Sequence, residues 1–128
     1  MNLLGDLFSL KELEVGDGEI RAVLHIDPNH AILRGHFPGL PVMPGVCMMQ
    51  VLREIFQRAN ASPVRITRGD NIKFLTVLEP SKYPQVFAVV RHQKAEGGYE
   101  VSASLETLPG SEPPFVFLKF KGAYEVIE

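Results

Sequence analysis

The sequence predicts an α+β domain in which one long helix packs against a curved antiparallel sheet. Only the segment from Pro44 to Asn60 shows the apolar periodicity of a long helix. Strand-like runs separated by glycine- and proline-rich turns fill most of the remaining sequence, including everything after Pro63. One helix followed by a series of antiparallel strands is the α+β pattern. At 128 residues, the chain is long enough for a single domain, residues 1–128, with one core.

The N-terminal part predicts a β-hairpin followed by a short turn. Phe8 to Val15 and Glu19 to Ile26 are rich in residues that favour strands, and Gly16-Asp17-Gly18 separates them. An aspartate between two glycines is a good hairpin turn. The next segment, Asn29 to Gly35, predicts a turn or a single helical turn.

The predicted helix begins at a Pro-Gly pair and ends near Asn60-Ala61-Ser62-Pro63. Apolar residues recur at helical spacing, and additional ones widen the stripe, so most sides of this helix are expected to be buried. The recurring positions are Val46, Met49, Leu52, Ile55, Phe56 and Ala59, and the additional ones are Met48 and Val51. The methionines at 43, 48 and 49 are expected to pack in the core.

The second half of the chain predicts four strands and one longer loop. The first strand is expected to be interrupted at Gly69-Asp70, and the second and third form a hairpin through Glu96-Gly97-Gly98. The predicted strands are Val64 to Val77, Gln85 to Gln93, Tyr99 to Leu108 and Phe115 to Val126, with the loop at Leu108 to Pro114.

Composition excludes several classes of function. No apolar run approaches the ~20 residues that cross a bilayer, and the first residues do not resemble a signal peptide. A single cysteine cannot form an internal disulfide, which favours a cytoplasmic location. The net charge of −2 argues against nucleic acid as a partner, because phosphate binding requires a basic excess.

Residues 36–50, HFPGLPVMPGVCMMQ, carry the strongest functional signal. A histidine precedes a turn that prolines and glycines make rigid, and this turn leads directly into the predicted helix. Such a connection can hold a titratable side chain close to a helix N-terminus, as reactive sites require. A buried turn with a purely structural role also requires a rigid backbone. Rigidity alone therefore does not distinguish a reactive site from a structural turn.

The segment resembles the signature of the 3-hydroxyacyl-[acyl carrier protein] dehydratases, HFPGxPVxPGVxxxE. The residues shared with that signature are His36, Phe37, Pro38, Gly39, Pro41, Val42, Pro44, Gly45 and Val46. Gln50 stands where the family has its catalytic glutamate. The run Lys73 to Pro80 is similar to the family's K/R-F-x-x-P-V-x-P strand, with two prolines replaced.

The resemblance implies a hot-dog fold, side-by-side dimers and an acyl thioester substrate. In the family, each active site takes its histidine from one subunit and its acidic residue from the helix of the other. The implied partner is an acyl carrier protein. The substrate is expected to carry a phosphopantetheine thioester, and no separate cofactor or metal is expected.

Dehydration of a 3-hydroxyacyl thioester requires a base, a site for the enolate-like oxygen and an acid for the hydroxyl. His36 suits the base, and the backbone N–H groups of Gly45 and Val46 suit the oxygen site at the helix N-terminus. Phe37, Gly39 and Pro44 are expected to bind substrate with them.

The candidates for the group that acts on the departing hydroxyl are Gln50 and Glu54. An amide can hydrogen-bond a hydroxyl but cannot protonate it at neutral pH, and loss of a general acid costs ~10²- to 10⁴-fold in rate. Glu54 lies one helical turn further on, so its carboxyl is a second candidate acid. The simpler alternative is a solvated Glu54 that pairs with a neighbour such as Arg58.

Other titratable residues favour structural roles. Cys47 is expected to be a small buried apolar residue, and His25, His30 and His92 lack the spacing of metal ligands. Arg65, Arg68, Arg91 and Lys94 could form a basic rim for an acidic carrier protein, although scattered strand cations are usually only solubilising.

Three functions are consistent with these residues. The first is a dehydratase of fatty-acid or related acyl-chain biosynthesis. The second is a catalytically silent acyl-carrier-protein binder or one half of a mixed dimer with a paralogue. The third is a hot-dog thioesterase in which Gln50 positions the thioester for attack by water.

Overall fold

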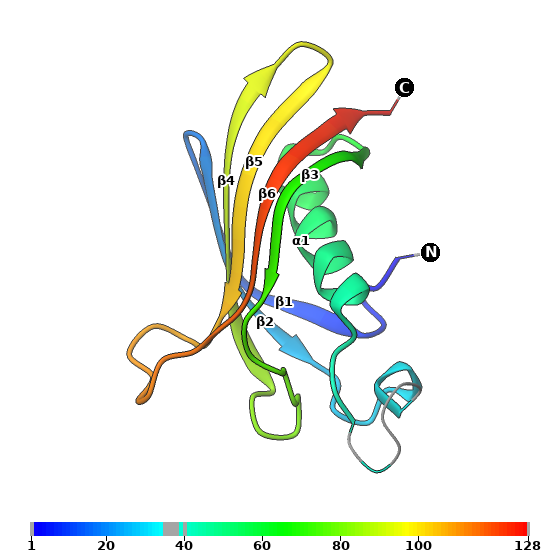
Figure 1. Ribbon diagram of the computed structural model, residues 1–128, viewed down its shortest axis with the longest axis vertical. Helices are drawn as coiled ribbons and strands as arrows, with labels where there is room; N and C mark the ends of the chain where they lie inside the picture. Colours follow the sequence, from blue (N-terminus) through cyan, green and yellow to red (C-terminus); the bar gives the residue numbers. More distant parts are fainter. Residues whose placement is uncertain (1, 35–38, 40, 128) are drawn as a thin grey trace.

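The computed structural model describes residues 2–34, 39 and 41–127 of the chain. Six antiparallel strands form one curved sheet in the order β1-β2-β4-β5-β6-β3, and helix α1 lies on its concave side (Figure 1). The elements are β1 (Phe8–Gly16), β2 (Glu19–Ile26), the 3-10 helix η1 (Ala31–Arg34), α1 (Gly45–Asn60), β3 (Val64–Phe74), β4 (Gln85–Ala95), β5 (Gly98–Glu106) and β6 (Val116–Val126). The predicted α+β hot-dog architecture is confirmed.

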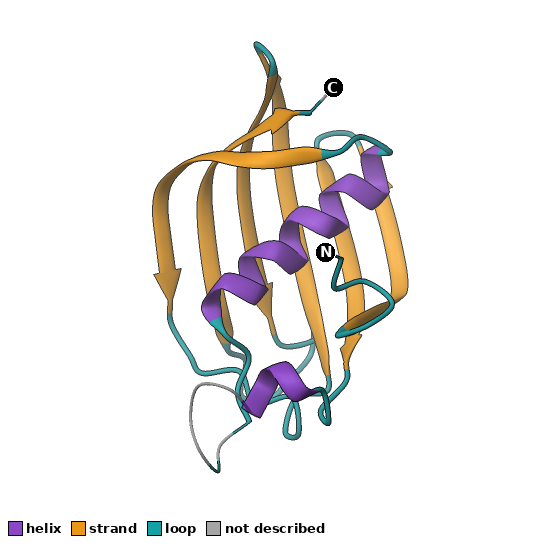
Figure 2. Cartoon of the chain, turned by 90° about the vertical axis from the view of Figure 1, so that its right-hand side faces the viewer, coloured by secondary structure: helices purple, strands orange, loops and turns teal. Residues whose placement is uncertain are grey.

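Helix α1 crosses the sheet diagonally and supplies one side of the core (Figure 2). The sheet supplies the other side with inward-facing residues such as Ile20, Leu24, Val90 and Leu105, each fully buried. The predicted burial of the helix is confirmed for most of its apolar positions, which are Met48, Val51, Leu52, Ile55 and Phe56. Met49 and Ala59 are only half-buried. Val46 departs furthest from the prediction, because its side chain remains 71% exposed at the first turn.

The two predicted hairpin turns are confirmed, and each is two residues long. Gly16 pairs with Glu19 across Asp17-Gly18, and Ala95 pairs with Gly98 across Glu96-Gly97. Gly18 and Gly97 have φ angles of +73° and +76°, which only glycine adopts readily.

Strand β3 forms one edge of the sheet and, among the described strands, is hydrogen-bonded to β6 alone. Its pairing shifts register between Gly69 and Asn71, as the predicted interruption required. The predicted end at Val77 is wrong, because regular pairing stops at Phe74. Beyond Phe74 the chain leaves the sheet, and the side chain of Leu78 is buried. The Leu78 carbonyl accepts a 2.8 Å hydrogen bond from the Met43 N–H, which ties this segment to the one before α1.

The C-terminal half of α1 is fixed to the sheet by an aromatic cluster. The ring of Phe56 makes edge-to-face contacts with His92, Tyr99 and Tyr124 at centroid distances of 5.2, 4.9 and 5.1 Å. Phe56 and Tyr124 are almost completely buried. Such aromatic pairs stabilise the packing beyond the area that they bury, so this end of the helix is rigidly held.

Candidate active site

The N-terminus of α1 presents two backbone donors. The carbonyl of Pro44 accepts hydrogen bonds from the N–H groups of Cys47 and Met48 at 3.0 and 3.1 Å. The preceding N–H groups, those of Gly45 and Val46, have no hydrogen-bond acceptor within the described residues. Unpaired donors in the first turn and the helix dipole together favour a negatively charged oxygen at this position.

An apolar groove of about 360 Å³ lies beside these donors. One wall is the start of α1 and the segment before it, and the other is the end of β3 and the segment that follows. The lining residues are Val42, Met43, Gly45, Met48, Phe74, Leu75, Thr76, Val77 and Leu78. A groove of this composition suits an apolar chain attached to a polar group.

Close packing at the groove explains the glycine at the start of the helix. A Cβ added at Gly45 would lie 2.6 Å from Cε1 of Phe74 and 2.7 Å from its Cζ. The Phe74 ring would have to move to admit any side chain there, although the ring is 54% exposed. Gly45 therefore lets Phe74 lie directly against the helix N-terminus.

Gln50 and Glu54 are joined on one face of the helix. The Gln50 Nε2 donates a 2.8 Å hydrogen bond to Glu54 Oε2. Glu54 is only 4% exposed, and its carboxylate also accepts 2.9 Å hydrogen bonds from the backbone N–H groups of Leu3 and Leu4. The expected solvated Glu54, paired with Arg58, is therefore wrong. Glu54 instead anchors the N-terminal segment and orients the Gln50 amide.

Two of the predicted site residues, His36 and Phe37, lie outside the described residues. Gly39 is exposed with a φ of +78°, which explains why a glycine stands in this turn. Pro44 is buried as the residue that caps the helix, and Gly45 and Val46 follow it as the first two helical residues. The structure thus brings Gly39, Pro44, Gly45 and Val46 to one end of the molecule, with Gln50 one helical turn further on.

Cys47 has the predicted structural role. Its side chain is 7% exposed within the core, and burial raises the pKa of its thiol. A protonated buried thiol is a poor nucleophile, so Cys47 does not suggest covalent catalysis.

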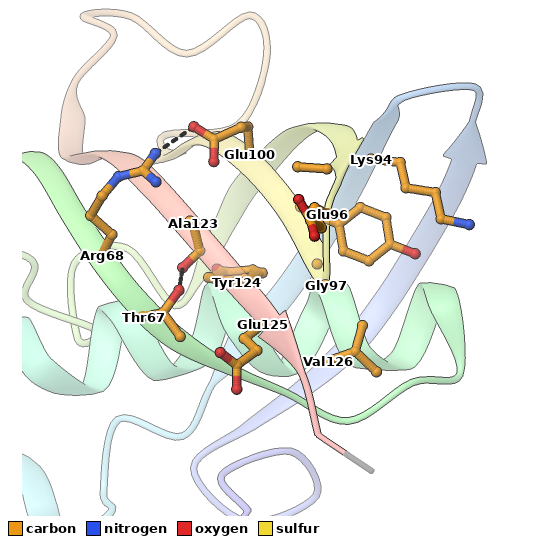
Figure 3. A pocket seen from close by; sticks show the side chains of 13 residues that line it. Thr67, Arg68, Lys94, Glu96, Gly97, Glu100, Ala123, Tyr124, Glu125 and Val126 are labelled. Atoms are coloured by element: carbon orange, nitrogen blue, oxygen red, sulfur yellow. Dashed lines mark hydrogen bonds and ion pairs between the residues drawn. The ribbon is translucent and has the colours of Figure 1, made fainter.

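A hollow of about 540 Å³ lies beside the β4–β5 hairpin (Figure 3). This hairpin is at the opposite end of the sheet from the helix N-terminus (Figure 1). Arg68 and Lys94, two of the predicted rim residues, line it. Arg68 is engaged by Asp70 at 2.7 Å and by Glu100. The hollow is open and its charges largely compensate each other, so it is a weaker candidate than the groove for an acyl site.

The groove wall from Phe74 to Val77 was not identified as a site from the sequence. Phe74, Leu75 and Val77 are 54%, 52% and 61% exposed, which is unusual for large apolar side chains. The available signal was a mostly apolar run, Phe74 to Leu78, at the end of a predicted strand. Its position beside the helix N-terminus depends on the fold.

Comparison with known proteins identifies the class. Residues 12–108 match the ApeI-like family, described as ApeI dehydratase. A FabZ 3-hydroxyacyl-[acyl-carrier-protein] dehydratase from Streptococcus agalactiae is 30% identical over 77% of this chain and 74% of its own length. A FabZ from Streptococcus mutans is 36% identical over 53% of this chain and 54% of its own length. The chain belongs to the ApeI-like family of hot-dog dehydratases.

A solved structure supports the fold. The dehydratase heterocomplex ApeI:P from Xenorhabdus doucetiae superposes with a TM-score of 0.65, covering 93% of this chain and 96% of that one at 18% identity. No helix within the described residues has the length and apolar character that a membrane span requires.

Proposed function

We propose that the chain dehydrates 3-hydroxyacyl thioesters carried by an acyl carrier protein, at the groove beside the N-terminus of α1. The observation that carries the proposal is that the groove lies beside the N–H groups of Gly45 and Val46, which have no acceptor in the described part of the chain. The acyl chain occupies the groove, and the thioester carbonyl oxygen accepts hydrogen bonds from the two backbone donors. These donors stabilise the negative charge that develops on that oxygen.

The proposed reaction is an elimination in which one proton is transferred twice. The neutral imidazole of His36 removes a proton from C2, and the electron pair forms the C2–C3 double bond as the C3–O bond breaks. Because the Gln50 amide cannot act as an acid, the imidazolium returns the proton to the departing hydroxyl, which leaves as water. Gln50, with its amide nitrogen donating to Glu54, holds the substrate hydroxyl by a hydrogen bond.

Glu54 is proposed as a positioning residue. Its two oxygens already accept hydrogen bonds from Leu3, Leu4 and Gln50, so proton donation to substrate would require that arrangement to break. The alternative acid role predicts a changed pH profile for turnover in Glu54→Gln. A positioning role predicts a lower rate with an unchanged pH profile.

The experiment follows formation of the enoyl absorbance from a 3-hydroxyacyl pantetheine thioester. His36→Ala is expected to abolish turnover. Gln50→Glu is expected to raise the rate by as much as ~10²-fold, because it introduces a carboxyl group beside Glu54 and one of two adjacent carboxyls remains protonated. Thiol release without enoyl formation would contradict the proposal and indicate a thioesterase.

The functional unit is proposed to be an assembly of at least two hot-dog chains, either a homodimer or a mixed dimer with a paralogue. Strand β3 is an edge strand, and its last eight residues, 67–74, are all exposed. Ile72 and Phe74 on this strand, with Val46 on the helix, leave apolar surface uncovered. Native edge strands of this kind are normally covered. Light scattering of the purified chain is expected to give at least twice the monomer mass of 14.2 kDa, and the monomer mass would indicate a mixed assembly or contradict the proposal.

A further measurement separates the mixed dimer from the absence of any assembly. Co-expression with a candidate paralogue and measurement of the joint mass tests the mixed dimer. Absence of both self-association and paralogue binding would overturn the proposed assembly. We further propose that the reaction takes place in the cytoplasm, because a single buried thiol with no second cysteine in the sequence is typical of a reducing compartment.

A further inference from the structure

The N-terminal turn, residues 3–8, is joined by one side-chain pair to the segment that precedes His36. Nε2 of His30 lies 3.0 Å from Oδ1 of Asp6. We propose that His30 is a positioning residue for the dehydration, because this pair fixes the ends of the segment that carries His36. This role rests on the proposed function, which makes His36 the base. The pair itself rests on contacts between described residues.

The two ring nitrogens of His30 have different partners. Nδ1 lies 3.1 Å from the backbone nitrogen of Ile32, whose N–H can only donate, so Nδ1 accepts and carries no proton. The proton of the neutral ring is therefore on Nε2, which donates a hydrogen bond to the Asp6 carboxylate. Helix η1 begins at the residue after His30. One side chain thus joins the start of η1 to the N-terminal turn.

The N-terminal turn is a firm anchor for this contact. The Glu54 carboxylate of α1 accepts hydrogen bonds from the Leu3 N–H, and the side chains of Leu3 and Leu7 are buried. Within the turn, the Leu3 carbonyl accepts a 3.0 Å hydrogen bond from the Asp6 N–H. The backbone of Asp6 is therefore held in place, although its side chain is 61% exposed.

On the other side of the pair, η1 borders the segment that carries His36, and it lies at the same end of the molecule as the N-terminus of α1 (Figure 1, Figure 2). The Leu33 N–H donates to the His30 carbonyl at 3.2 Å, and the Leu33 carbonyl accepts a 3.2 Å hydrogen bond from the Val42 N–H. Leu33 and Val42 are both buried, so the two ends of this segment are joined inside the fold. His36 follows Leu33 by three residues, and a displacement of η1 is therefore transmitted to it along the chain.

The pair is expected to affect the rate more than the stability of the fold. An ion pair with so exposed a carboxylate contributes little to stability. Catalysis is more sensitive, because a displacement of about 1 Å can cost ~10²-fold in rate. Glu54, which anchors the turn, also accepts the hydrogen bond from the Gln50 amide. The N-terminal turn therefore supports both side chains that act on the substrate in the proposed reaction.

The experiment measures kcat and KM for a 3-hydroxyacyl pantetheine thioester with the full chain in its native assembly. Asp6→Ala removes the acceptor of the pair and is expected to lower kcat about tenfold or more. KM is expected to be unchanged, because the groove and the backbone donors that bind the substrate are untouched. Asp6→Asn keeps an uncharged acceptor and is expected to restore most of the rate. Glu19→Ala, which removes the carboxylate of the exposed 3.0 Å pair with Arg91 on the sheet, is the matched control.

Two substitutions of His30 separate the pair from the local bond to η1. Glutamine offers a donor near the position of Nε2, within reach of Asp6, whereas asparagine offers an acceptor near the position of Nδ1, beside the Ile32 N–H. His30→Gln is therefore expected to keep most of the wild-type kcat, and His30→Asn to lose as much as Asp6→Ala. The double variant of Asp6→Ala and His30→Asn is expected to lose no more than either single variant. Wild-type kcat in Asp6→Ala or in His30→Asn would overturn the proposal, and the second result would leave His30 only a local structural role.

Hydrogen exchange at the Val42 amide tests the pair independently of turnover. Because this N–H is bonded to the Leu33 carbonyl, its exchange is expected to accelerate in Asp6→Ala and in His30→Asn but not in Glu19→Ala. Faster exchange with an unchanged kcat would overturn the positioning role while the dehydratase activity stands. If the wild type forms no enoyl product, the proposed function fails, and exchange at Val42 decides alone. Acceleration in Asp6→Ala then supports the pair, and unchanged exchange overturns it.

Discussion

The two ends of helix α1 differ in how completely their groups are satisfied. At the C-terminal end, Phe56 is enclosed by rings from three strands, and the Val64 N–H is bonded by the Gln57 side chain at 2.8 Å. At the N-terminal end, two backbone donors have no acceptor among the residues that the structure describes, and exposed Phe74 and Val77 line the groove. The packing at the C-terminal end contributes to the stability of the fold. The donors and the groove at the N-terminal end contribute little to it and remain available to bind a ligand, as is usual for a functional site.

Alanine substitutions at Phe56 and Phe74 compare the contributions of the two ends to stability, and the larger effect is expected at Phe56. Phe56→Ala removes a ring that is 0% exposed and leaves a cavity, so the free energy of unfolding is expected to fall by about 3 to 5 kcal/mol. Phe74→Ala, which removes a half-exposed ring at the other end, is expected to cost less than about 1 kcal/mol. Urea denaturation measures both, and equal costs would mean that the two ends are not differently packed.

Glu54 lies between the two ends of α1, and its replacement is expected to have an intermediate effect on stability. Glu54→Gln replaces one acceptor oxygen by a donor that would face the N–H groups of Leu3 and Leu4. Leaving a buried donor unsatisfied costs about 1 to 3 kcal/mol. Hydrogen exchange at Leu3 and Leu4 is expected to accelerate, and unchanged protection there would show that the carboxylate does not anchor the segment.

His92 gives the C-terminal end a modest dependence on pH. Burial lowers the pKa of its imidazole below the ordinary value of 6.5, and its Nε2 is buried without a hydrogen-bond partner among the described residues. Because the unfolded state binds the proton more strongly, stability is complete above pH 6.5 and is lost as the pH falls below it. In His92→Gln this part of the pH dependence is expected to vanish. A wild-type slope that persists in the variant would assign it to other groups.

Much of the fold could be predicted because local patterns and tertiary structure agree. The hairpin at Asp17-Gly18 and the helix after Pro44 need only turn chemistry and periodicity. Strand β6 was harder, because Phe117 and Leu118 are both fully buried in succession. Phe117 is covered in part by Tyr83, a residue distant in sequence, whose ring centroid lies 5.6 Å from that of Phe117.

The candidate site was predictable only where it is contiguous in sequence. Gly39, Pro44, Gly45 and Val46 belong to one local motif, so their grouping near the helix N-terminus could be predicted. The roles of Glu54 and Phe74 depend on contacts with Leu3 and Gly45, which are 51 and 29 positions away in the sequence. Sequence spacing gives no measure of such contacts, and the expected solvated Glu54 was wrong for that reason.

The central claim is that the first N–H groups of α1 bind the substrate oxygen, and replacement of Val46 tests it most directly. Val46→Pro removes one of these donors, and the first helical turn tolerates proline because Gly45 lacks the Cβ that would clash with the ring. With a pantetheine thioester, kcat is expected to fall about 10²-fold or more. Val46→Ala, which retains the N–H and changes only a side chain that is 71% exposed, is expected to keep the wild-type rate. A Val46→Pro protein that is folded and turns over at the wild-type rate would contradict the claim.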